Sequence, residues 1–286
     1  VYVSGVLKPE FGTKIQIFFQ RIRPYLPWIY CFDWRIETDN SFPHGSGIAS
    51  SASGFAALAG ALMQLEGTWS QEEQSEKWLY EKTSFLARLG SGSAARSISG
   101  PLMYWGYHPN LPKSNNLFAV ALTQNLSPVF LDYHDTILLV DKGQKAVSSS
   151  VGHNLMHDHP FSSQRFVQAQ HHIERLLGIL NSGDLEAFCD LVETEALTLH
   201  AMMMTSKPSY ILLKPNTLAV IERVRAYRKD CQIPVCFTLD AGANVHLLYP
   251  SACASKVLPW IKEELSFFCE NGQYIEDKVG TGLEII

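Results

Sequence analysis

The sequence contains no run of basic residues. Its 23 Lys and Arg residues are dispersed among 28 Asp and Glu residues, and the formal net charge is -5. A protein that binds nucleic acid needs clustered cations that release phosphate counterions. We therefore expect no nucleic-acid partner.

Long apolar segments are also missing. Stretches such as TILLV at Thr136–Val140 have the length of a single strand, whereas a membrane-spanning helix needs about 20 apolar residues. We expect no membrane partner. The composition, 46% hydrophobic and 18% charged, is typical of a chain that buries an ordinary core.

The cysteines show no CxxC spacing, which argues against a zinc ribbon and against a disulfide scaffold. Reduced thiols and a cytoplasmic location are therefore predicted. The six residues are Cys31, Cys189, Cys231, Cys236, Cys253 and Cys269.

A glycine-rich run precedes an Ala-rich stretch at Phe42–Leu62, which reads FPHGSGIASSASGFAALAGAL. Glycines at Gly45, Gly47 and Gly54 permit close approach of the main chain to a ligand. A helix that starts near Ser50 or Ser51 would offer its unpaired N–H groups to an anion. The alternative is a tight turn that a serine caps before a buried helix.

A second Gly/Ser loop, RLGSGSAARS, spans Arg88–Ser97. Arg96 supplies a planar fork suited to a carboxylate or a phosphate, and Ser91 and Ser93 add hydroxyls. Neither loop has the spacing of a Walker A motif or of a GxGxxG dinucleotide motif. Two such loops indicate two anionic ligands.

Four motifs in a fixed order resemble the GHMP kinase superfamily and, within it, the diphosphomevalonate decarboxylase family. They are GIASSASGFAAL at Gly47–Leu58, GSGSAARS at Gly90–Ser97, KAVSSSVG at Lys145–Gly152 and TLDAGANVHLLYP at Thr238–Pro250. The stretch ALTLHAMMMTSKP at Ala196–Pro208 is similar to the family's helix and loop after the third motif. The chain departs from the usual family residues at Ala95, Pro101, Ser150 and Ala243.

The order of strands and helices beyond a polar seam at Pro109–Ser127 predicts a layered α+β domain with an antiparallel sheet. The resemblance implies a two-lobed GHMP kinase fold with the active site in the cleft between the lobes. A nucleotide-binding lobe like ribosomal protein S5 domain 2 would span residues 1–127, and a ferredoxin-like lobe would span residues 128–286.

The resemblance also implies an activity, the ATP- and Mg²⁺-dependent decarboxylation of (R)-mevalonate 5-diphosphate by a homodimer. The phosphates of ATP would be bound by Gly45, Ser46, Gly47, Ala49, Ser50, Ser51 and Ser53. The substrate would be bound by Ser91, Gly92, Ser93, Arg96 and Ser149. No protein ligand to the metal is expected, because Mg²⁺ would bridge nucleotide oxygens and keep water as most of its remaining ligands.

Asp240 ends the apolar strand PVCFTLD, and the small residues Ala241–Gly242–Ala243 follow it. A carboxylate in that place either faces a cleft or caps its own turn. The resemblance implies that Asp240 lies near the hydroxyl to be phosphorylated, as a base or an electrostatic organiser. We therefore predict Asp240 and Arg96 as the catalytic residues.

The histidines of GHNLMHDHP offer a competing interpretation. His153 and His157 are four residues apart, as zinc ligands on one helix face would be. Pro160 and the preceding Asp158–His159 favour a helix terminus instead, so no metal site is predicted here.

Family members begin with a strand and an Asn-Pro-Ser-type segment that this sequence does not match. Val1 corresponds to the family's middle, so the sequence is either a fragment or that of a protein without the expected lysine and tyrosine. The alternatives are a related GHMP small-molecule kinase, a mevalonate 5-phosphate decarboxylase, and a catalytically idle ligand-binding member.

Local patterns make four further predictions. Trp28–Thr38 alternates like a half-buried strand, and Ala52, Ala56, Ala59 and Gly60 form a small-residue helix face. Ser70 and Glu73 form a capping box for the helix that follows. A short final strand is expected near Gly282–Ile286.

Overall fold

The computed structural model describes residues 1–42, 48, 50–70, 74–123, 125–143 and 155–284. These divide into two compact units. The first contains the described residues up to 122 except Ile48, together with residues 280–284. The second contains Ile48 and the described residues of Thr123–Val279. The mixed helix and sheet composition of the predicted α+β class is confirmed.

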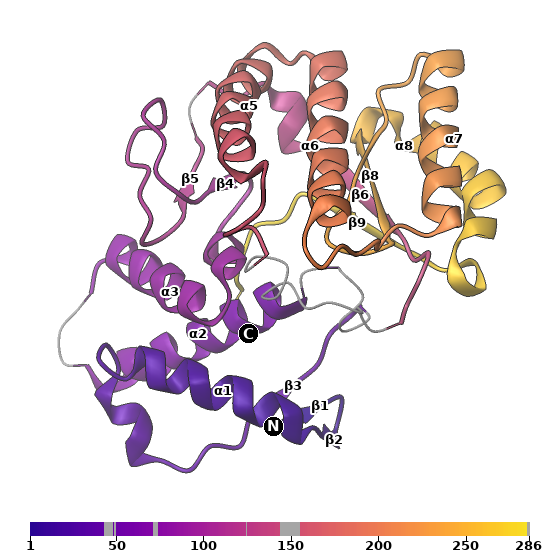
Figure 1. The fold of residues 1–286 in the computed structure, drawn as a ribbon. Coiled ribbons are helices and arrows are strands. Elements are labelled where there is room, and N and C mark those ends of the chain that lie inside the picture. Colours follow the sequence, from indigo (N-terminus) through magenta and orange to yellow (C-terminus); the bar gives the residue numbers. More distant parts are fainter. Residues whose placement is uncertain (43–47, 49, 71–73, 124, 144–154, 285–286) are drawn as a thin grey trace. The chain divides into compact units, whose positions relative to one another are not determined.

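The first unit is mainly helical. Its long helices are α1 (Pro9–Ile22), α2 (Ser50–Trp69) and α3 (Glu76–Gly90), and a 3₁₀ segment follows at Gly92–Ile98 (Figure 1). Short strands complete it: β1 (Tyr2–Val3), β2 (Val6–Leu7), β3 (Glu37–Thr38), β4 (Met103–Tyr104) and β5 (Val120–Ala121). Strand β1 pairs with β2 antiparallel and with β3 parallel, and β4 pairs with β5.

The small-residue face of α2 lies in the core of the first unit, as predicted. Ala52, Ala56 and Ala59 are buried against apolar side chains of α1 and α3, among them Phe18 and Leu86. Small residues let helix axes approach closely, and this places the beginning of α2 next to the end of α3.

The end of α3 depends on Gly90 for packing. A Cβ on Gly90 would lie 2.2 Å from the ring of Phe55 on α2, which is closer than any side chain tolerates.

The predicted capping box is wrong. Helix α3 begins at Glu76, and its N-cap is Ser75, whose side chain accepts from the backbone N–H of Trp78.

The second unit contains a four-stranded antiparallel sheet. Its order is β7 (Cys236–Thr238), β8 (Val245–Pro250), β6 (Tyr133–Leu138) and β9 (Tyr274–Lys278). In this register Thr136 lies opposite Leu247, and the Thr136 hydroxyl lies 2.7 Å from that of Tyr249. The pairing of β6 with β8 buries both groups with their polar atoms satisfied.

Helices cover this sheet. They are α5 (Ser162–Ser182), α6 (Leu185–Thr205), α7 (Pro215–Cys231) and α8 (Ala254–Trp260), which continues into a π-helical turn at Ile261–Leu265 (Figure 1). The core consists of Val220 and Val224 from α7, Phe237 and Leu247 from the sheet, Val257 from α8, and their apolar neighbours.

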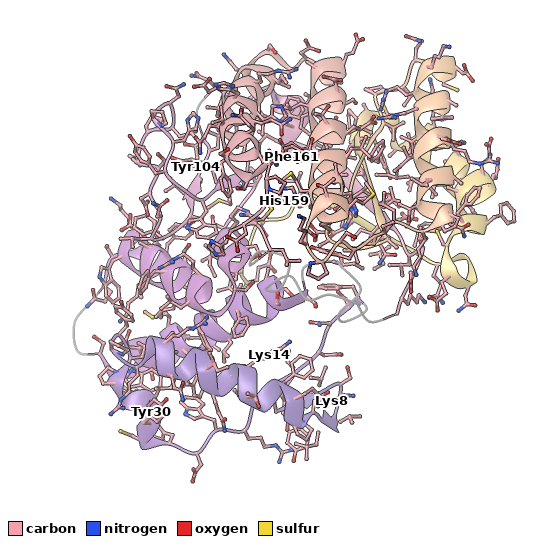
Figure 2. The ribbon with its side chains drawn as sticks, viewed as in Figure 1. Lys8, Lys14, Tyr30, Tyr104, His159 and Phe161 are labelled. Carbon is pink, nitrogen blue, oxygen red and sulfur yellow. The ribbon has the colours of Figure 1, made fainter. Side chains whose placement is uncertain are left out.

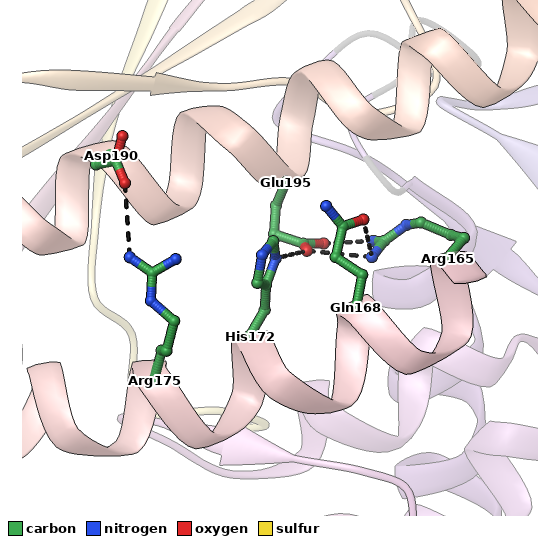
Figure 3. Close-up of polar contacts among 6 residues, drawn as sticks. All are labelled: Arg165, Gln168, His172, Arg175, Asp190 and Glu195. Carbon is green, nitrogen blue, oxygen red and sulfur yellow. Dashed lines mark hydrogen bonds and ion pairs between the residues drawn. The ribbon is translucent and has the colours of Figure 1, made fainter.

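Polar contacts join α5 to α6 (Figure 3). The Glu195 carboxylate on α6 accepts from Arg165 on α5, with a Nη1–Oε1 distance of 3.2 Å, and pairs with Nδ1 of His172. Arg175 and Asp190 form a longer pair at 3.6 Å. These polar groups link the facing sides of the two helices.

One strand prediction is wrong, and another lies partly outside the described residues, at residues 285–286. Trp28–Thr38 forms a 3₁₀ turn at Pro27–Cys31 and only the two-residue β3, and the Trp28 ring packs in tilted and edge-on contacts with Trp34 and Trp69. At the C-terminal end, the described residues 282–284 contribute one bridge, Ser99 with Gly282. Strand β9 was not predicted from the sequence.

The pH dependence of stability is expected to include a contribution from His246 on β8. Burial lowers the pKa of His246, but the hydrogen bond to Asp135 and the charges of Asp135, Asp240 and Asp277 outweigh burial and raise it. A raised folded-state pKa stabilises the fold fully below the unfolded value of about 6.5. This stabilisation disappears as the pH rises through the folded-state pKa.

We therefore expect urea unfolding of the wild type and of His246→Gln to differ most near pH 6 and to converge at higher pH. Asp135→Asn should remove the same difference, since it deletes the partner. A gap between wild type and His246→Gln that widens with rising pH would contradict this assignment.

Candidate active site

The first turn of α2, which follows the first Gly/Ser loop in the sequence, lies next to the second loop in the first unit. The hydroxyl of Ser51, in the first turn of α2, lies 3.4 Å from the hydroxyl of Ser91, which follows α3 directly. Ser53 donates to the carbonyl of Ser50 at 3.2 Å. Residues 40 positions apart thus bring hydroxyl groups together beside the N-terminus of a 20-residue helix. Such a helix end favours anions, because its first N–H groups lack partners within the helix.

A buried hydroxyl that the sequence analysis missed supports the second loop. Ser84 of α3 is fully buried, donates to the carbonyl of Ala95 at 2.8 Å, and accepts from the N–H of Ala119 at 2.9 Å. Ala95 directly precedes Arg96, so one side chain ties the 3₁₀ segment to α3 and β5. No local signal could have revealed it, since both partners are distant in sequence.

Gly92 lies under an aromatic ring. A Cβ there would approach the Trp105 ring to 3.0 Å, and the Trp105 indole N–H donates to the carbonyl of Asn116. The close approach explains why glycine suits this position of the loop. Ser91, Gly92 and Ser93 are half-buried, whereas Arg96 is exposed in the same segment.

Some predicted positions lie outside the described residues. They are Gly45, Ser46, Gly47, Ala49 and Ser149, together with His153 of the histidine motif. Gly54 lies inside α2 with open space around its Cβ position. It therefore has no need of a backbone conformation special to glycine.

Asp240 lies in the second unit, two residues after β7, and is exposed. Its carbonyl accepts from the N–H of Gly242 at 2.7 Å, which closes a tight turn. Its carboxylate makes no hydrogen bond with any described residue. The main chain therefore forms the turn without the acidic group.

His200 on α6 is a second group that the sequence analysis did not single out. It is 2% exposed, and its Nε2 lies 3.1 Å from the carbonyl oxygen of Asp240. Burial lowers the pKa of His200, and the backbone hydrogen bond and charge of Asp240 offset this only in part. The ring is therefore neutral near pH 7, with the Nε2 proton directed at the carbonyl.

The described part of the histidine motif, residues 155–160, forms a turn before α5. The residues before it, where the predicted helix terminus would begin, lie outside the described residues. His159 is buried, and its Nε2 lies within hydrogen-bonding distance of the Met202 carbonyl and the Thr205 hydroxyl at the end of α6 (Figure 2). Its Nδ1 accepts from the N–H of Phe161. His159 therefore serves as a hydrogen-bonded link between this turn and α6.

The described residues contain no group of three or more His, Cys, Asp or Glu side chains able to hold a metal ion. No described helix is both long enough and apolar enough to cross a membrane.

Two family models match the sequence. The model of the diphosphomevalonate decarboxylase-like N-terminal domain matches residues 2–115, and that of the mevalonate 5-diphosphate decarboxylase C-terminal domain matches residues 136–282. The two matches follow one another along the chain and cover both units.

Curated relatives agree with the family models. A phosphomevalonate decarboxylase from Haloferax volcanii is 30% identical over 254 residues, which cover 86% of this chain and 71% of the relative. A diphosphomevalonate decarboxylase from Ganoderma lucidum is 26% identical over 253 residues, covering 82% and 58%. The chain thus spans less than two thirds of the length of this fungal relative.

Solved structures show the same fold. The mevalonate diphosphate decarboxylase from Staphylococcus aureus aligns with a TM-score of 0.81 at 28% identity, covering all of this chain and 81% of that one. A structure described as MDDEF in complex with MVAPP, AMPPCP and magnesium aligns with a TM-score of 0.81 at 27% identity, covering 99% and 81%.

Proposed function

This chain belongs to the mevalonate 5-diphosphate decarboxylase family, and on that premise we propose that it converts (R)-mevalonate 5-diphosphate and ATP to isopentenyl diphosphate, ADP, phosphate and CO₂. The observation that carries the proposal is the proximity of the first turn of α2 to the second Gly/Ser loop, where Ser51 and Ser91 are 3.4 Å apart. A reaction between two polyanions requires adjacent anion sites, and a helix N-terminus beside a Gly/Ser loop suits that need.

The reaction requires a group that handles the proton of the substrate hydroxyl. A tertiary hydroxyl is a poor leaving group, so transfer of the ATP γ-phosphoryl group first makes it a phosphate ester. Phosphate then leaves as the bond to the carboxylate breaks, and that electron pair forms the double bond while CO₂ departs. Asp240 accepts the hydroxyl proton or organises the charge around it.

Substrate and nucleotide are assigned to separate groups. The start of α2 and the residues before it bind the ATP phosphates through Gly45, Ser46, Gly47, Ala49, Ser50, Ser51 and Ser53. Arg96 binds the substrate carboxylate, and the diphosphate is bound around Ser91, Gly92, Ser93 and Ser149. A guanidinium fork matches a planar carboxylate, whereas hydroxyls and N–H groups suit phosphate oxygens.

The residues at the start of α2 are compatible with Mg²⁺. Their serine hydroxyls are hard oxygen groups, and such groups are found beside a Mg²⁺ ion that phosphate and water mainly coordinate. When bound, the ion neutralises charge on the transferred phosphoryl group. The similar MDDEF complex contains magnesium together with AMPPCP and MVAPP.

A second candidate substrate carries one phosphate group instead of two. The Haloferax volcanii relative is named a phosphomevalonate decarboxylase, so mevalonate 5-phosphate is the alternative substrate. Purified protein should be given ATP, Mg²⁺ and each acid in turn, with ADP and CO₂ both measured. We expect equal amounts of the two products with the diphosphate.

Other product patterns would refute the proposal. ADP without CO₂ would show a small-molecule kinase, and products only from the monophosphate would select the alternative substrate. Ligand binding without either product would show a catalytically idle member.

We further propose that the protein acts in the cytoplasm as a homodimer. The exposed thiols of Cys31 and Cys231 suit a reducing compartment, and the dimer follows from the family resemblance. Sedimentation at micromolar concentration checks the dimer, and a mass of 32.0 kDa in solution would contradict it.

The Arg96→Lys variant is expected to lose at least about tenfold in kcat/KM, because a point charge cannot replace two parallel hydrogen bonds to a carboxylate. Steady-state kinetics with varied mevalonate diphosphate measure the loss. Arg35→Lys is the matched control, since Arg35 is exposed in the same unit and pairs with Glu37. Near-normal efficiency of Arg96→Lys would remove Arg96 from the site.

A further inference from the structure

Three buried polar side chains hold the segment Asp240–Asn244. His200 of α6 contacts the Asp240 carbonyl at 3.1 Å. Thr217 of α7 donates its hydroxyl to the Ala243 carbonyl at 2.7 Å. Asn244 accepts from the N–H of Asp141, just beyond β6, at 3.0 Å. Each of the three is at most 2% exposed.

The burial of three polar side chains at one loop is energetically costly unless each of them is hydrogen-bonded. A buried histidine or threonine that lacks a partner destabilises a fold, and apolar residues would fill the same space at lower cost. Here His200 and Thr217, from two different helices, each contact a different carbonyl of one short loop, and Asn244 of the loop accepts from the N–H of Asp141. Contacts of this kind limit the conformations available to the loop more than apolar packing does, because hydrogen bonds are directional.

We propose that His200 and Thr217 are positioning residues that fix the loop Asp240–Asn244 so that the Asp240 carboxylate is held ready for the substrate. The inference rests on the proposed function for its catalytic consequence and on the hydrogen bonds alone for its structural part. His200 and Thr217 act through the main chain. The Asp240 side chain is left out of the contacts that fix the turn, which keeps it available for chemistry.

Paired substitutions separate the hydrogen bond from the bulk of the side chain. His200→Met removes the donor at similar volume, and His200→Gln restores an N–H donor. Thr217→Val removes the hydroxyl, and Thr217→Ser keeps it. His171→Met on the exposed face of α5 is the control for losing a histidine.

We expect His200→Met and Thr217→Val to lower kcat by about tenfold to a hundredfold, since a small displacement of a catalytic group has effects of that size. The KM values for ATP and substrate should change less than about threefold. His200→Gln and Thr217→Ser should recover most of the turnover. Thr217 also accepts from the N–H of Lys214 in the N-terminal cap of α7, so the melting temperature is measured alongside.

Amide hydrogen exchange provides a readout that needs no activity. The Gly242 N–H donates to the same carbonyl that His200 contacts, and it should exchange faster in His200→Met than in the wild type or in His171→Met. If the wild type decarboxylates nothing, the proposed function fails, and exchange alone then decides the positioning role.

Three results would overturn the positioning role. One is a folded His200→Met enzyme with normal kcat. Another is an equal loss of kcat in the Met and Gln variants, which would show that the donor is unimportant. The third is Gly242 exchange that stays unchanged in both His200→Met and Thr217→Val.

Discussion

The Asp240→Asn variant is expected to lose at least about a hundredfold in turnover while it binds ATP and mevalonate diphosphate as the wild type does. Removing a group that acts mainly in the transition state lowers kcat and leaves ground-state binding nearly unchanged. Asparagine keeps the shape of the side chain. The turn should survive as well, because the Asp240 carbonyl and not its carboxylate accepts from Gly242 and contacts His200.

The measurement is the release of ADP and CO₂ by the variant, with binding followed separately by calorimetry. Asp230→Asn is the matched control, since Asp230 is an exposed carboxylate near the end of α7. Normal release by Asp240→Asn would limit this residue to shaping the loop. Weakened binding with intact chemistry would make it a binding residue.

The Glu193→Ala variant should lose about 3 kcal/mol of unfolding free energy, because it leaves two arginines without their shared partner. Glu193 is 4% exposed on α6. Its carboxylate pairs with Arg225 at 3.1 Å and with Arg228 at 2.5 Å, and Arg228 also donates to the Val235 carbonyl. The hydrogen bond to Glu193 raises the pKa of Arg228 despite burial. Through these contacts Glu193 and the two arginines join α6 to α7 and to Val235, the residue before β7.

Denaturant unfolding at pH 7 tests this result. Glu264→Ala is the control, since Glu264 forms an exposed pair with Arg223 at 3.7 Å and should contribute well below about 1 kcal/mol. Glu193→Gln should fall between the two, because its amide keeps one accepting oxygen for the arginines but not the charge. Equal stability of the Glu193→Ala and Glu264→Ala variants would show that burial adds nothing to this ion pair.

Periodic and compositional features were predictable from the sequence. The alanine face of α2 follows from a 3.6-residue repeat, and its burial required no knowledge of its partners. The layered α+β domain with its antiparallel sheet was predicted because long or strongly patterned segments carry their own signal. Strand β9 was missed, since the sequence YIEDK is short and its last three residues are exposed at a sheet edge.

Boundaries were less predictable than elements. Ser70 precedes Glu73 by the spacing of a capping box, but α3 begins at Glu76 with Ser75 as its N-cap. The turn at the described end of the histidine motif is linked to the end of α6 by hydrogen bonds of His159, and no local pattern indicated those contacts.

The sequence by itself determined the family, the α+β class and the residue types of two Gly/Ser loops, because glycine, serine and arginine at fixed spacing reflect local conformation and chemistry. Tertiary structure alone decided which of these residues meet. Ser51 and Ser91 are 40 positions apart, His200 reaches the carbonyl of a residue 40 positions later, and residues 280–284 return to the first unit. Contacts of such separation arise from the packing of whole helices and sheets, whose free energy is summed over many distant residues and leaves no periodic trace in any one segment.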